Sequence, residues 1–163
     1  MDGHFTGYAS VFGVPDLGRD VVVPGAFAAS LARHGPAGVR LLFQHDPAEP
    51  IGRWIALRED AHGLFAEGQL NLAVQRAREV DALLRGGGID GLSIGFRTLL
   101  ARRGAGGERR LHRVDLWEIS LVTFPLQPQA RASPAPDPRA PDALAAEIRG
   151  LARKIAPPAT PRP

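Results

Sequence analysis

The chain has 163 residues, with 20 Lys and Arg, 17 Asp and Glu, and no Cys. This length is typical of one domain of roughly 100–200 residues, and it is too short for a (β/α)₈ barrel of about 250 residues. The absence of Cys excludes disulfides, thiolate metal sites and a Cys nucleophile. We find no run of ~18 apolar residues for a membrane span and no signal peptide at the start, so we expect a cytoplasmic protein without a membrane partner.

The formal charge of +3 is unevenly distributed. Residues 1–126 carry 14 basic and 14 acidic residues, so the surplus lies in the segment from Gln127 onward. A neutral body is a poor electrostatic footprint for DNA or RNA. A nucleic-acid partner is therefore not expected.

The first 126 residues are predicted to be mainly strands, because β-rich runs alternate with turn-forming segments. In chain order we expect strands at 5–12 and 19–23, a short helix at 26–33, a strand at 39–44, a hairpin of 51–58 and 64–70, a helix at 74–84, and two long strands at 91–102 and 110–124. Helical periodicity turns Val74, Ala77, Val80, Leu83 and Leu84 of the second helix inward and Asp81 outward. The expected fold class is mainly β with peripheral helices, in a small antiparallel barrel.

The remaining residues, 127–163, are predicted to form a Pro-rich tail outside this 1–126 domain. Proline removes backbone donors, so the stretch Gln127–Pro141 is expected to form a linker without a strand ladder. Apolar residues at helical spacing predict a short amphipathic helix over Asp142–Ile155, followed by a disordered end. Docking of this helix on its own domain and binding of a partner both stay open.

Ser93 is the candidate nucleophile. It lies in Gly91-Leu92-Ser93-Ile94-Gly95, where a strand places Ser93 and two glycines on one face and Leu92, Ile94 and Phe96 on the core face. Glycines let another chain approach the hydroxyl closely, although they can equally serve a bulge beside an ordinary serine. The letters also fit the nucleophile elbow of esterase-like hydrolases, but that motif needs a helix next and strand-like residues follow here.

His45 is the best candidate base among five histidines. It ends an apolar strand and precedes Asp46-Pro47, a place where an imidazole can be held rigidly. Taken alone, a histidine at a strand end is more often structural.

Glu118 is the best candidate for a third residue that orients the histidine. It interrupts the apolar strand Leu116–Val122, where alternation would put Leu116, Glu118 and Ser120 on one face and Trp117, Ile119 and Leu121 on the other. A buried carboxylate must be paired or protonated. Its partner could be His45 or one of the many arginines, and Asp115 and Asp46 are rival acids.

As a set, five segments in order resemble the prohead (procapsid) maturation proteases of tailed bacteriophages, whose fold is similar to herpesvirus assemblin. They are Gly7–Phe12, Val23–Phe27, His45 with Pro50–Arg53, Gly91–Phe96 and Trp117–Pro125. One segment departs from the family pattern: Pro125-Leu126-Gln127-Pro128 stands where Pro-Ala-Asn-Pro is usual.

The resemblance implies a serine endopeptidase on a β-barrel with peripheral helices, with His45 as base, Ser93 as nucleophile and Glu118 as third member. We expect no cofactor and no metal. The implied substrates are the major capsid protein with its scaffolding segment, and the protease itself, inside the assembling procapsid of a phage, a prophage or a gene transfer agent. A homodimer stays open, because assemblin-type enzymes often dimerise. The alternative is a capsid-assembly or scaffolding module that keeps the barrel without catalysis.

Overall fold

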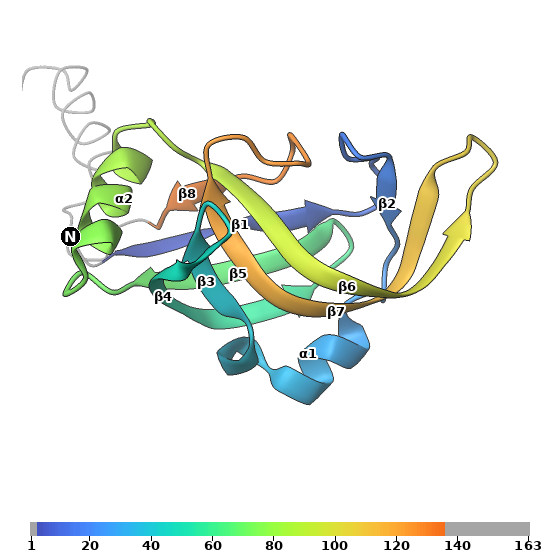
Figure 1. Ribbon diagram of the computed structural model, residues 1–163, viewed down its shortest axis with the longest axis horizontal. Helices are drawn as coiled ribbons and strands as arrows, with labels where there is room; N and C mark the ends of the chain where they lie inside the picture. The colour runs from blue at the N-terminus through green and yellow to red at the C-terminus, as the bar shows by residue number, and fades with distance from the viewer. Residues whose placement is uncertain (1–2, 136–163) are drawn as a thin grey trace, which may run out of the picture.

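The computed structural model describes residues 3–135, which form one strongly curled sheet with two peripheral helices (Figure 1). The strands are β1 His4–Val11, β2 Asp20–Val22, β3 Arg40–Phe43, β4 Asp46–Glu59, β5 Gly63–Leu70, β6 Gly91–Arg103, β7 Arg109–Val122 and β8 Ala132–Pro134. The helices are α1 Ala28–His34 and α2 Gln75–Arg85, with a short 3₁₀ turn at Pro36–Gly38. The elements predicted for residues 1–126 are all present within about five residues of their expected bounds. The mainly β prediction is therefore confirmed.

The strands follow the order β2-β7-β3-β4-β5-β1-β8, and β6 pairs with the other edge of β7. Most pairs are antiparallel, but β2 and β3 both run parallel to β7. The expected small antiparallel barrel is therefore corrected to a mixed sheet that curls into a half barrel. Parallel neighbours require a long connection, and the chain passes from β3 to β7 through β4, β5, α2 and β6. The segment carrying α1 leads from β2 to β3.

The curl of the sheet encloses one apolar core. Its largest fully buried side chains come from most of the strands and from the residue directly before α1. They include Phe5, Phe27, Leu41, Ile51, Leu64, Leu92 and Ile119. Trp54 meets Phe5 edge-on, with ring centroids 5.6 Å apart. Leu92 is fully buried and Ile94 and Phe96 pack against the core, as the alternation in β6 predicted.

Helix α2 buries a narrower stripe than its sequence predicts. Ala77, Val80 and Leu84 are buried, but Val74 and Leu83 are 36% and 46% exposed. Asp81, predicted to face outward, is buried and accepts hydrogen bonds of 3.1 Å from Arg85 one turn later. An acid that is paired at this spacing can be covered by its neighbours.

The segment after residue 126 is partly built into the sheet. β8 pairs with β1 antiparallel, so the expectation of a linker without a ladder is wrong for residues 132–134. Gln127 is buried, and its side-chain amide accepts from Val11 N at 2.6 Å and donates to the Val11 and Val14 carbonyls at 2.9 Å. The predicted helix at 142–155 and the end of the chain lie outside the described residues, and the domain division at 126 stays a prediction for them. In the part that is described, no helix has the length and apolarity to cross a membrane.

Candidate active site

The turn between β3 and β4 holds His45 in an unusual backbone conformation. Gln44 and His45 have φ of 55° and 59°, in the left-handed region that non-glycine residues seldom occupy. Backbone and side-chain hydrogen bonds to the end of β7 hold the turn in place: Gln44 N donates to Leu121 O at 3.0 Å, and the Gln44 amide donates to Thr123 Oγ1 at 2.6 Å. A backbone strain that the surroundings enforce is often found at functional sites.

His45 is joined to Glu118 by a short hydrogen bond. Its Nδ1 donates to Glu118 Oε1 at 2.5 Å, and the second carboxylate oxygen accepts from Ser120 Oγ at 2.7 Å. The Ser120 hydroxyl in turn accepts from His45 N at 3.1 Å. The two side chains are 43% and 14% exposed, so the acid is shielded while the imidazole is open to solvent.

This hydrogen bond determines the protonation behaviour of the imidazole. The Glu118 carboxylate raises the pKa of His45 above its usual range, chiefly through the hydrogen bond and also through its charge, while partial burial opposes the shift. Because Nδ1 is engaged, Nε2 is the nitrogen available for proton transfer.

Ser93 lies on β6 beside this pair. The β6–β7 register places Ser93 directly opposite Ser120 and Gly95 opposite Glu118, and opposite residues in a ladder share a face. Ser120 is also opposite Leu42 of β3, three residues before His45. Ser93 is 7% exposed, and within residues 3–135 its hydroxyl has no hydrogen bond to the His45 ring. The sheet therefore brings the three predicted residues to one region, with the Glu118–His45 contact already formed.

Gly95 makes room for the acid. A Cβ on Gly95 would overlap the Glu118 carboxylate. The alternation of side chains along the strand predicted that Gly95 and Ser93 share the face that is turned away from the core. In the structure, the Glu118 carboxylate occupies the space that a side chain at position 95 would take.

Strand β7 contains a β-bulge at Trp117 that the sequence did not reveal. Gly95 pairs with Glu118 but the next residue, Phe96, pairs with Leu116, which leaves Trp117 without an opposite residue. Leu116 therefore joins Ile119 and Leu121 in the core, while Trp117 is 55% exposed. The predicted division, with Leu116 on the face of Glu118 and Trp117 on the face of Ile119, is wrong because the bulge shifts the alternation by one.

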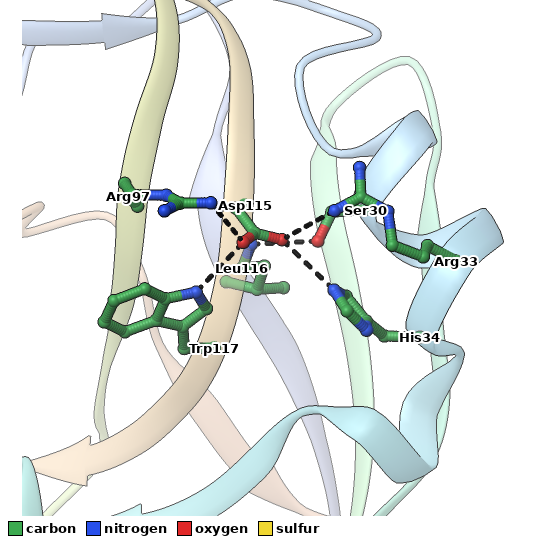
Figure 2. Close-up of polar contacts among 7 residues, drawn as sticks. All are labelled: Ser30, Arg33, His34, Arg97, Asp115, Leu116 and Trp117. Carbon is green, nitrogen blue, oxygen red and sulfur yellow. Dashed lines mark hydrogen bonds and ion pairs between the residues drawn. The ribbon is translucent and has the colours of Figure 1, made fainter.

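The rival acids have other partners. Asp115 is 6% exposed and accepts from Trp117 Nε1 and His34 Nε2, both at 3.1 Å (Figure 2). These hydrogen bonds, Trp117 first, lower the pKa of Asp115 despite its burial. Asp46 accepts from Ala48 N at 2.8 Å in its own turn. Neither acid is bonded to His45 in the part of the chain that is described.

Helix α1 supplies a partner of Asp115 that the sequence did not single out. His34, the last residue of α1, contacts the carboxylate of Asp115, which lies 81 positions later in the chain. No local pattern could have found this pair. Among residues 3–135, no group of three or more His, Asp and Glu side chains is placed to hold a metal ion.

An imidazole that is hydrogen-bonded to a carboxylate and lies near a strand serine provides the groups that acyl-transfer chemistry uses. The fold is shared with herpesvirus proteases. The protease of Kaposi's sarcoma-associated herpesvirus, solved with a hexapeptide phosphonate inhibitor, matches with a TM-score of 0.55 and 13% identity over 94% of this chain and 77% of that one. The varicella-zoster virus protease matches with a TM-score of 0.52 and 14% identity, with the same coverage.

Sequence comparison gives the family. Residues 1–139 match the Caudovirus prohead serine protease model, and the chain belongs to that family. It is 37% identical over 131 residues to the prohead protease of Enterobacteria phage HK97, which covers 78% of this chain. The match spans 58% of the length of that curated relative. The family resemblance expected from the five sequence segments is confirmed, and rejection of the nucleophile elbow is supported because β6 continues as a strand to Arg103.

Proposed function

We propose that this protein is a serine endopeptidase of procapsid maturation, with Ser93 as nucleophile, His45 as base and Glu118 as the residue that orients His45. The observation that carries the proposal is the 2.5 Å hydrogen bond between His45 Nδ1 and Glu118, formed next to the strand that carries Ser93. Membership of the prohead serine protease family supports it.

In the proposed mechanism, His45 Nε2 takes the proton of Ser93 as Oγ bonds to the substrate carbonyl carbon. The imidazolium then gives that proton to the leaving amine as the C–N bond breaks. Water, deprotonated by His45, releases the acyl group and restores Ser93. Glu118 keeps the proton on Nδ1 throughout, so that Nε2 is free to accept one.

The substrate would bind as an added strand. At Gly91 and Leu92, β6 is bridged to residues 130–131, but beyond them the edge opposite β7 has no strand partner among the described residues. An extended peptide can pair with such an edge through main-chain hydrogen bonds. This geometry would lay the peptide bond across Ser93.

By its family, the proposed substrates are the major capsid protein with its scaffolding segment, and the protease itself. The proposed location is the inside of the assembling procapsid, after cytoplasmic synthesis. The proposal leaves open whether the active enzyme is a homodimer.

The test is to co-express the protein with its own major capsid protein and measure intact masses. We expect capsid fragments with the natural protein and none with Ser93→Ala. Ser133→Ala, at an exposed serine of β8, is the matched control and should cleave normally. Normal processing by Ser93→Ala would overturn the proposal. An uncut capsid protein that copurifies with the natural chain would instead favour the non-catalytic assembly module.

A further inference from the structure

A cluster of polar side chains surrounds Asp115, next to the β7 bulge (Figure 2). We propose that Asp115 is a positioning residue: its contacts to Trp117, to β6 and to α1 fix the bulge that lets Glu118 face His45 while Leu116 is buried in the core. The inference deepens the proposed function and rests on the roles given there to His45 and Glu118.

The spacing of the core-facing residues along β7 shows that the strand contains one extra residue. Leu116 and Ile119 are both buried in the core although they are three positions apart, and Asp115 and Glu118 both lie on the outer side with the same spacing. Two residues at an odd separation share a face only if the strand contains an extra residue. Without the bulge, Leu116 and Glu118 would share a face, so Leu116 could not be buried in the core while Glu118 lies on the face of Ser93.

Beside the bulge, one edge of β7 has no strand partner between its pairings with β2 and β3. On this edge, β2 pairs with β7 up to Leu111 and β3 begins to pair only at Glu118. The chain between β2 and β3 supplies the partners in the gap: Ala26 O accepts from Val114 N at 3.1 Å, and the buried Ser30 Oγ accepts from Leu116 N at 2.9 Å. A side chain of α1 thus satisfies the backbone next to the bulge.

The Asp115 side chain ties the bulge to both neighbours. One carboxylate oxygen accepts from the indole of Trp117, the bulged residue itself, at 3.1 Å and lies 3.4 Å from Arg97 of β6. The other accepts from His34 of α1 at 3.1 Å and lies 3.6 Å from Arg33. Figure 2 shows Asp115 between Arg97 and Trp117 on one side and the α1 residues on the other.

The carboxylate therefore has donors from three elements, and the residue is only 6% exposed. Hydrogen bonds to a charged, shielded acceptor are stronger than neutral ones. They hold Trp117 out of the ladder, and Glu118 follows directly after it. This links α1 to the His45–Glu118 contact through two residues of backbone.

The test measures the imidazole of His45 directly, by NMR titration of the full chain. In the natural protein Glu118 raises the pKa of His45. In Asp115→Asn we expect this pKa to fall toward the free value of about 6.5, as it would in Glu118→Gln. The matched control is Asp81→Asn, because Asp81 is also a buried acid paired with an arginine, Arg85 of α2. The control should leave the His45 titration unchanged even if it lowers the melting temperature.

Trp117→Phe provides a milder second variant, since the side chain is half exposed and loses only its indole donor. It should shift the His45 titration in the same direction by a smaller amount. In peptide cleavage, both variants should lower kcat about tenfold or more with little change in KM. An unchanged His45 titration in Trp117→Phe and in any folded Asp115→Asn protein would overturn the inference.

The two proposals fail in different ways. If the natural protein cuts no capsid protein but its His45 titration still depends on Asp115, the positioning role stands and the peptidase does not. If the natural protein cuts and both variants keep its titration and its kcat, the peptidase stands and the positioning role does not.

Discussion

The contact between His45 and Glu118 gives one side chain two linked properties, basicity and stability. The hydrogen bond raises the pKa of His45. A base must be neutral to accept a proton, so the proposed cleavage should increase as the pH rises through this raised pKa. The same pair stabilises the fold most below a pH of about 6.5, and this stabilisation is lost as the pH rises through the pKa of the folded state.

We therefore expect Glu118→Gln to move the inflection of the kcat/KM–pH profile down toward about 6.5. The rate should fall by up to about 10⁴-fold, because an amide no longer holds the catalytic tautomer. His45→Ala should lose more. Steady-state kinetics on a capsid-derived peptide would measure both. An acidic limb that stays where it is in Glu118→Gln would show that Glu118 does not set the basicity of His45.

A second prediction concerns Gly95, because the Glu118 carboxylate occupies the space that a side chain at this position would take. Gly95→Ala should push the acid away from His45 and lower kcat about 100-fold, since displacements of about 1 Å in a catalytic group have such effects. Gly88→Ala is the control, because the nearest atom to its Cβ would be the flexible end of Leu83, at 3.2 Å, and the backbone of Leu83 would be at ordinary contact distance. Cleavage assays and denaturation curves on both variants separate the two effects. Full activity in a folded Gly95→Ala protein would contradict the prediction.

At the scale of elements, the β6–β7 hairpin brings like charges together. Arg102 is opposite Arg110 and Arg103 is opposite Arg109, toward the turn at one end of the molecule (Figure 1). Like charges directly opposite each other destabilise a ladder. Asp20 compensates for part of this by binding Arg109 through both carboxylate oxygens, at 2.7 and 2.5 Å.

Arg102→Glu should therefore raise the free energy of unfolding by about 0.2–1 kcal/mol, and less at high salt. Arg113→Glu is the matched control, because Arg113 is opposite Leu100 and gains no cross-strand ion pair. Urea denaturation at low and high ionic strength would measure the difference. Equal effects of the two variants would mean that cross-strand charge is not the cause.

The sequence predicted which face of β6 is buried, but it did not predict the bulge in β7. Alternation in β6 correctly placed Leu92 in the core, because one face of that strand is small and polar. In β7 the residues around Glu118 are apolar on both faces, so a one-residue bulge leaves no trace in the pattern. Ser93, His45 and Glu118 could be selected from residue type and setting, but the contact of His34 with Asp115 depends on tertiary packing between elements 81 residues apart. Proline content suggested no ladder after Gln127, yet β8 is a three-residue edge strand, a position that tolerates proline.

At the scale of the whole molecule, Gln127 ties the end of the described chain to its first strand. Gln127→Ala would leave the buried backbone of Val11 without its side-chain partners. An unsatisfied buried group costs about 1–3 kcal/mol, so the free energy of unfolding should fall by that amount. Gln75→Ala is the control, because its amide bonds only Glu79 on the exposed surface of α2. Guanidinium denaturation would compare them, and a loss no larger than the control's would show that the amide is dispensable.

The central position of β7 has a consequence for when the protein can act. This strand pairs with β2, β3 and β6, and it carries the acid that holds an imidazole 73 residues earlier. Pairings between distant segments form slowly, after the loops between them have closed. A nascent chain that has left the ribosome only as far as β6 would contain both Ser93 and His45. It would still lack β7, the strand between β3 and β6 that brings these two residues close together. If Ser93, His45 and Glu118 act as proposed, we expect a nascent chain to stay unable to cleave itself until β7 has been made, because β7 carries the acid and follows β3 and β6 in the sequence.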